Sequence, residues 1–209
     1  NIKYVYPKEE EIERPELDAQ QQYVRQFFNE MGTALNASYF KDPKRGYAKY
    51  IDVDAAIDHH LLNVVAFNVD ALRLSGYMHK PRGGKLMFGP IWDFDLSLGN
   101  NYADRSSEGF AIKGAGWYSR LFQDSNFVET VKDRFDHFYS QKDQFIAMIN
   151  QQASDIEGAQ QRNFVKWPIL GVWVWPNAVS FTEYDHEVSY LSDWFSDRMD
   201  WLDGAIKDL

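Results

Sequence analysis

The 209-residue sequence contains no cysteine, so it can form neither a disulfide bond nor a thiolate metal site. It also has no run of about 18 consecutive apolar residues, the minimum for a helix that crosses a membrane. We therefore predict a chain without a transmembrane span and without cysteine chemistry.

Positive charge is scarce as well. The sequence has 22 Lys and Arg residues against 31 Asp and Glu residues, and its formal net charge is −9. Proteins that bind the phosphate backbone of nucleic acids present a clustered basic surface, and no such cluster is visible here. Nucleic acid is therefore not an expected partner.

Apolar residues are plentiful, at 44% of the sequence with 16% aromatic, which suffices for one core, and we predict a single domain over residues 1–209. Apolar residues recur at helical spacing, which predicts helices over residues 16–35, 52–67, 125–139, 141–161 and 183–207. An alternating pattern over residues 77–88, interrupted by Gly83-Gly84, predicts a β-hairpin. Residues 2–6 suggest a short strand or extended segment, and residues 8–15 a charged connector. The predicted fold class is mainly α with a small β-hairpin.

Two further groups of residues receive structural interpretations. His59 and His60 are adjacent on a predicted helix, where neighbouring side chains point in different directions, so we expect a solvated helix face rather than a metal site. Trp167, Trp173 and Trp175 belong to a loop rich in aromatic residues and proline. We expect these tryptophans to dock against the core rather than to stack on sugars.

Asp93 and Asp95 stand two positions apart among bulky apolar residues. In an extended segment both carboxylates face one side while Trp92 and Phe94 face the core. Paired carboxylates suit Mg²⁺ or Mn²⁺, which are commonly shared with substrate phosphates. Asp70, near the end of a predicted helix, would come within reach as a third acid. A purely local role, with Asp95 capping the following turn, stays open.

Lys80, Arg82 and Lys85 flank the predicted hairpin loop and are candidates for contacting a phosphate or an acidic peptide. Two other functions also remain open. One is a glycoside hydrolase with Asp70 and Asp93 as its carboxylate pair. The other is a noncatalytic surface-binding module with a tryptophan-rich loop and a structural metal ion.

Two stretches resemble the CotH kinase family of secreted or spore-coat atypical protein kinases. They are "YIDVDAAIDHHLLNVVAFNVDALRLSGYMHK" and "GKLMFGPIWDFDLSLGN", and the likeness extends to "IKYVYPKEEEI", "RNFVKWPILG" and "EVSYLSDWFSDRMDWLD". The most specific parts are N-x-D at Asn68 to Asp70 and G-P-x-W-D-F-D at Gly89 to Asp95. The resemblance therefore covers nearly the whole chain.

The resemblance implies phosphoryl transfer from ATP to Ser or Thr of a protein substrate. It places Asp70 at the catalytic-loop position and Asp93 at the metal-binding position, with Asp95 as a second ligand where relatives can carry Asn. Asn68, the first residue of the N-x-D motif, and Ser75 become candidates for the cofactor site. Ser75 is included because it follows Asp70 at the offset where ordinary protein kinases place a metal-binding Asn. It also implies a bacterial protein that is secreted or exposed at the cell surface.

In fold, the resemblance is to the C-terminal lobe of an atypical protein kinase. The strands of an N-terminal nucleotide-binding lobe would precede residue 1, so the missing lobe of the same polypeptide is an expected partner. We expect the 209-residue chain alone to transfer phosphate weakly or not at all.

Overall fold

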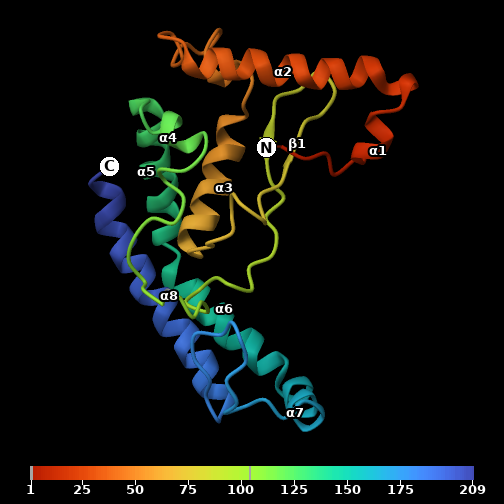
Figure 1. Ribbon diagram of the computed structural model, residues 1–209. Helices are drawn as coiled ribbons and strands as arrows, with labels where there is room; N and C mark the ends of the chain where they lie inside the picture. The colour runs from red at the N-terminus through yellow and green to blue at the C-terminus, as the bar shows by residue number, and fades with distance from the viewer. Residues whose placement is uncertain (1, 104) are drawn as a thin grey trace. The chain divides into compact units, whose positions relative to one another are not determined.

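The computed structural model describes residues 2–103 and 105–209, most of which form helices (Figure 1). The elements in chain order are α1 (Glu9–Ile12), η1 (Pro15–Leu17), α2 (Asp18–Asn36), η2 (Tyr47–Lys49), α3 (Val53–Val65), β1 (Met78–His79), β2 (Met87–Phe88), α4 (Tyr118–Leu121), α5 (Ser125–Tyr139), α6 (Lys142–Asp155), α7 (Glu157–Lys166) and α8 (Tyr184–Lys207), with η for 3₁₀ helices. Strands β1 and β2 form a two-stranded sheet. The predicted class, mainly α with a small hairpin, is confirmed. No described helix is both long enough and apolar enough to span a bilayer.

The chain divides into two compact units. The first contains residues 1–53 and 80–87, and the second contains residues 54–79 and 88–209. The predicted hairpin loop thus belongs to the first unit, while both acidic motifs, at Asp70 and at Asp93, belong to the second.

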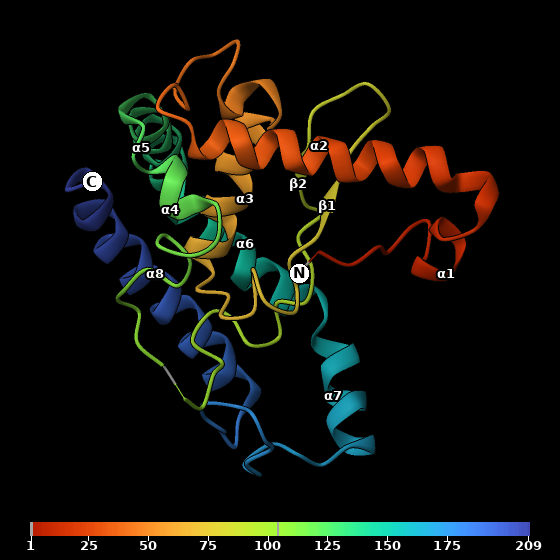
Figure 2. The ribbon, with the colours of Figure 1, turned by 45° about the horizontal axis from the view of Figure 1, so that its top comes forward.

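Helix α2 is the main element of the first unit, and α1 lies near its N-terminal end (Figure 2). Its apolar stripe buries Met31 and Leu35. The hairpin loop is held in this unit by main-chain bonds, because the Leu86 amide donates to the Tyr50 carbonyl at 2.8 Å and the Asp52 amide donates to the Leu86 carbonyl at 2.9 Å.

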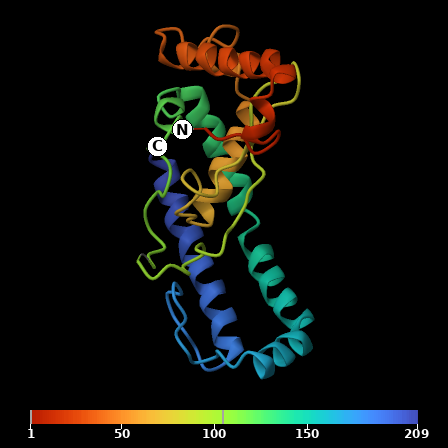
Figure 3. The ribbon, with the colours of Figure 1, turned by 45° about the vertical axis from the view of Figure 1, so that its right-hand side comes forward.

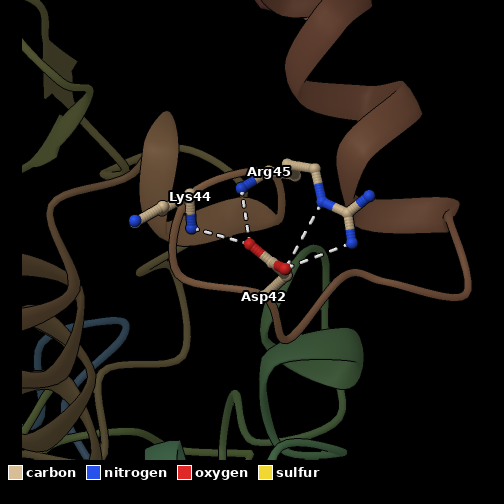
Figure 4. Close-up of polar contacts among 3 residues, drawn as sticks. All are labelled: Asp42, Lys44 and Arg45. Atoms are coloured by element: carbon tan, nitrogen blue, oxygen red, sulfur yellow. Dashed lines mark hydrogen bonds and ion pairs between the residues drawn. The ribbon is translucent and has the colours of Figure 1, made fainter.

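The loop that follows α2 closes around Asp42 (Figure 4). One carboxylate oxygen accepts the amides of Lys44 and Arg45, both at 2.9 Å, and the other accepts the Arg45 guanidinium. The Lys44 amide and these Arg45 bonds hold the pKa of Asp42 below its usual range. Gly46 completes the turn because a Cβ there would lie 1.9 Å from the Phe40 carbonyl oxygen.

The second unit is a helical assembly in which α8 lies along α5 and α6 (Figures 1 and 3). Its core contains the apolar faces of α3, α5 and α8, whose fully buried members include Ile57, Leu61, Val64, Phe127, Val131, Phe135, Met199, Leu202 and Ile206. Charged pairs reinforce the contacts at the edge of this core: Arg134 of α5 bonds Asp54, at 2.8 Å, and Asp58 on α3.

The prediction of a solvated His59–His60 face is wrong. The side chains of His59 and His60 are 4% and 1% exposed. His59 Nδ1 lies 3.0 Å from the Tyr118 hydroxyl, and His60 packs against the rings of Tyr118 and Phe122. Burial lowers the pKa of His59 to about 4 and that of His60 to about 3, so both are neutral core residues near pH 7.

Three local predictions also differ from the structure. Residues 2–6 form no strand, and the charged connector contains α1. The predicted helix over residues 141–161 is broken at Ile156, where α6 ends and α7 begins. Neither α6 nor α7 has a fully buried side chain, so no continuous core contact holds them in line.

Candidate functional site

Residues 66–75, here called the Asp70 segment, leave the end of α3 through a sharp turn. Phe67 has a φ of +50°, and the amide of Asn68 donates to the carbonyl of Asn63 at 2.9 Å. A positive φ is uncommon for a bulky side chain and occurs where the surrounding structure fixes it. The turn therefore sets the direction in which Asp70 is presented.

Hydrogen bonds organise the interior of the Asp70 segment. Asn68 is 1% exposed, donates to Asn63 Oδ1 at 3.1 Å and accepts the Asp70 amide at 3.1 Å. The Asp70 carbonyl accepts three amides, those of Arg73, Leu74 and Ser75, at 3.0–3.1 Å. The structure thus brings together Asn68, Asp70 and Ser75, three residues singled out from the sequence.

The Asp70 carboxylate forms an ion pair with Arg73. Arg73 Nη2 lies 2.8 Å from Asp70 Oδ1; the Asp70 side chain is 15% exposed and that of Arg73 75% exposed. An exposed pair of this kind contributes little to stability, but it restricts the rotamer of the carboxylate. Asp70 is therefore a partly accessible acid with a defined orientation.

Residues 89–100, here called the Asp93 segment, do not form the expected strand. Trp92 is 58% exposed rather than buried in the core, and Asp93 has a φ of +62°. A left-handed residue interrupts the alternation of an extended chain, so the predicted division into a core face and an acidic face is wrong here. Asp93 and Asp95 are nevertheless both exposed to solvent.

Asp95 also has a local role. Its Oδ1 accepts the amide of Leu96 at 2.9 Å, and its carbonyl accepts Nδ2 of Asn100 at 3.0 Å. These bonds close the turn at residues 95–100, in line with the capping alternative. A carboxylate has several acceptor sites, so this bond leaves further lone pairs on the Asp95 carboxylate for a cation.

A main-chain bond joins the two segments: the Leu98 amide donates to the Ala66 carbonyl at 2.7 Å. Within residues 2–103 and 105–209, the non-glycine residues with positive φ are Phe67, Asp93 and Leu98, and all three lie in these two segments. Such conformations cost roughly 1–3 kcal/mol each and cluster at functional sites. The strained backbone conformations thus lie in the two segments that the sequence motifs predict to form the site.

Helix α8 supports both segments with three residues spaced four apart. Tyr190 donates to the Gly99 carbonyl at 3.0 Å, and a Cβ on Gly99 would lie 2.5 Å from the Trp194 ring. Arg198, which is fully buried, donates to the Val64 carbonyl at the end of α3 at 2.6 and 3.1 Å.

Arg198 also donates to the carbonyls of Ser107 and Gly109, at 2.8 Å each. Arg198 is a positioning residue that was not predicted from the sequence. Its mark in the sequence is an arginine within the apolar stripe of the last helix, adjacent to Met199 and one turn before Leu202.

A divalent metal ion needs a convergent set of oxygen ligands. Over residues 2–103 and 105–209, no three His, Asp or Glu side chains gather into a group that could hold a metal. The expected third acid is therefore not found. Asp93 and Asp95 are exposed carboxylates, the type of ligand that Mg²⁺ and Mn²⁺ take in nucleotide sites together with water and phosphates, and their role as metal ligands stays a prediction.

The hairpin cations lie in the first unit. Lys80 Nζ donates to the Tyr23 hydroxyl at 2.6 Å and lies over the Phe27 ring, so it packs against α2. Arg82 and Lys85 are exposed. Their role toward a substrate stays a prediction.

The loop between α7 and α8 does not bury its tryptophans. Trp167, Trp173 and Trp175 are all more than half exposed, so the predicted docking against the core is wrong. The Trp173 ring nitrogen donates to the Asn177 carbonyl at 2.7 Å.

Comparison with known proteins places these features in a family. The model of the CotH kinase protein family matches residues 3–202 of the chain. Curated proteins and solved structures gave no match. Because the family match spans the Asp70 segment, the Asp93 segment and the helix that supports them both, the chain belongs to the CotH kinase family.

Proposed function

We propose that the chain carries the acceptor- and metal-binding groups of a kinase that transfers phosphate from ATP to Ser or Thr of a protein. The observation that carries the proposal is the bond from the Leu98 amide to the Ala66 carbonyl, which joins the two segments where backbone strain is concentrated. Family membership supports phosphoryl transfer as the type of reaction.

In this mechanism Asp70 accepts the proton of the acceptor hydroxyl or orients it for attack. The Arg73 ion pair keeps the carboxylate in one orientation, and Asn68 fixes the main chain beneath it through the Asp70 amide. Ser75, buried and bonded through its amide to the Asp70 carbonyl, closes the turn. Positioning of this kind supplies much of the catalysis in phosphoryl transfer.

Asp93 and Asp95 would hold the Mg²⁺ or Mn²⁺ ion. Such an ion supplies positive charge that offsets the charge on the nucleotide phosphates. Asp93 is exposed at a left-handed backbone position, and the turn at residues 95–100 holds Asp95 nearby.

Calorimetric titration with Mg²⁺ and ATP tests the proposal. Asp93→Asn removes one charge while keeping a residue that tolerates positive φ, and we expect metal-dependent nucleotide affinity to fall at least about tenfold. Asp143→Asn, at an exposed position in the first turn of α6, is the control with the same change of charge. Equal affinities in the two variants would refute the assignment of Asp93.

A further inference from the structure

A cavity of about 380 Å³ lies beside the loop between α7 and α8, within the second unit. This volume is within the range of small-molecule sites, roughly 300–1,000 Å³. The lining includes residues of the Asp93 segment, of the loop and of α8. Figure 3 shows the loop beside the N-terminal half of α8. The cavity is therefore built by segments that are distant in the sequence.

The lining presents both hydrogen-bond donors and acceptors. Glu187 Oε1 accepts the Phe181 amide at 2.9 Å, and Asn177 Oδ1 accepts from the Asn100 side chain at 3.3 Å. Among residues 2–103 and 105–209, no hydrogen bond engages Glu187 Oε2, the Asn177 side-chain nitrogen or the Ser180 hydroxyl. These three unpaired polar groups are an acceptor, a donor and a hydroxyl that can act as either.

Aromatic rings are exposed around the cavity. Trp173 and Trp175 alternate along the chain with Val172 and Val174, which line the cavity, and are 53% and 67% exposed. Tyr102 is 55% exposed, and its ring centroid lies 6.2 Å from that of Trp175. Exposed aromatic rings beside a partly polar cavity are typical of a site that binds another molecule.

Hydrogen bonds hold these rings in place before any ligand arrives. The Trp173 ring nitrogen donates to the Asn177 carbonyl at 2.7 Å, and the Asn177 amide donates to the Val174 carbonyl at 2.9 Å. The Tyr102 amide donates to the Pro176 carbonyl at 3.1 Å. A surface that is ordered in advance loses less conformational freedom when it binds.

The mixture of groups restricts the ligand. Cations suit the carboxylates and the aromatic rings, but Lys, Arg and quaternary ammonium groups accept no hydrogen bond and would leave the Asn177 nitrogen unpaired. A lipid bilayer would bury the Glu187 carboxylate without a partner. Sugar hydroxyls both donate and accept, and the C–H groups of a sugar ring can pack on the electron-rich face of an aromatic ring. A sugar therefore matches every part of this surface.

We propose that the loop between α7 and α8, together with Tyr102, binds a neutral oligosaccharide. One sugar ring packs on Trp175 and Tyr102, and a neighbouring ring places its hydroxyls against the three unpaired polar groups of the cavity. Asp95 also lines the cavity and is left to the metal ion of the proposed function. β-Linked glucose and N-acetylglucosamine are the expected units, because their rings present C–H groups on both faces. This inference does not rest on phosphoryl transfer.

Calorimetric titration with cellohexaose and with hexa-N-acetylchitohexaose tests the inference, in buffer with EDTA and without nucleotide. At least one of the two should bind with a Kd below about 1 mM. Trp175→Ala removes a stacking surface and should weaken that binding at least about tenfold. Trp92→Ala is the matched control, because Trp92 is 58% exposed and its ring contacts Tyr77 instead of the loop.

A second pair of variants tests the polar side of the site. Glu187→Gln keeps an oxygen for the Phe181 amide but removes the charge that strengthens a bond from a sugar hydroxyl, and should weaken binding about threefold or more. Glu183→Gln is the control, at an exposed position outside the lining. Thermal melts establish that all four variants are folded.

The inference would be overturned if neither oligosaccharide bound, or if Trp92→Ala lost as much affinity as Trp175→Ala. Trp175-dependent binding of choline, adenosine or phosphatidylcholine vesicles in place of the oligosaccharides would also overturn it, and would assign the surface to a cation, a nucleobase or a bilayer. Because the titrations contain neither nucleotide nor free metal, their outcome is separate from that of the kinase proposal.

Discussion

The Asp70 segment is closed by its own hydrogen bonds, whereas the Asp93 segment leaves its side chains in solvent. Asn68 and Ser75 are buried beside Asp70, and a single carbonyl there accepts three amides. Trp92, Asp93 and Asp95 are exposed, although the same backbone bond ties both segments together.

This difference matches the two tasks proposed for the segments. A group that handles a substrate proton must be held in place before the substrate arrives, and the protein supplies that order with its own bonds. A metal-binding carboxylate must be accessible, and its final geometry includes oxygen ligands from water and phosphate. The contrast predicts that stability depends on the Asp70 side and ligand binding on the Asp93 side.

Acid should produce the largest effect, and it acts on α3, which leads into the Asp70 segment. The pKa values of buried His59 and His60 lie below the ordinary 6.5, so between pH 6.5 and about 4 the unfolded chain binds protons that the folded chain does not. Stability is therefore full above pH 6.5 and falls on acidification. From pH 7 to pH 5 the free energy of unfolding should drop by about 2 kcal/mol for each histidine.

Denaturant titrations at the two pH values measure this drop. His60→Leu should remove about half of the pH dependence. His137→Leu, at an exposed position on α5, should leave it unchanged. A pH dependence that survives in full in His60→Leu would show that the buried pair is not its source.

The next effect compares the two segments directly. Asn68→Ala removes the acceptor of the Asp70 amide and a donor to Asn63, and should lower the free energy of unfolding by about 2 kcal/mol. Asp93→Asn should change it by less than about 0.5 kcal/mol, because that side chain is exposed. Asn150→Ala, on the exposed face of α6, is the control for Asn68→Ala. Equal destabilisation by Asn68→Ala and Asp93→Asn would break the contrast.

Arg73→Ala should lower the free energy of unfolding by less than about 1 kcal/mol, because Arg73 is largely exposed. Its effect should appear instead in the rate of phosphate transfer, through the orientation of Asp70. Arg45→Ala removes an ion pair with the same i,i+3 spacing, to Asp42, and should leave transfer unchanged. Transfer rates that respond equally to both variants would refute a positioning role for Arg73.

Periodicity predicted the elements with strong apolar stripes. The helices α2, α3, α5 and α8 follow the predicted ranges closely, because each buries one face in a core. The break at Ile156 was not predicted, because α6 and α7 bury no side chain completely and composition there permits one helix or two.

At the site, local motifs predicted which residues come together around Asp70. They did not predict the left-handed backbone at Asp93, since a tertiary bond such as that from Leu98 to Ala66 has no trace in local sequence. Adjacent histidines gave no sign of burial on both sides, because that depends on the distant Tyr118 and Phe122. The exposure of Trp167, Trp173 and Trp175 likewise depends on whether distant parts of the chain cover them, which local sequence does not show.

Tyr190, Trp194 and Arg198 lie four residues apart on α8, so they follow one another at about one per helical turn. The successive turns of α8 fix how far the end of α3 stands from the glycine at position 99, since each turn advances about 5.4 Å. One residue inserted between Trp194 and Arg198 would rotate everything beyond it by about 100° and withdraw the guanidinium from its carbonyls. The helical spacing along α8 thus helps to set the distance between the Asp70 segment and the Asp93 segment, although neither Asp70 nor Asp93 lies on α8.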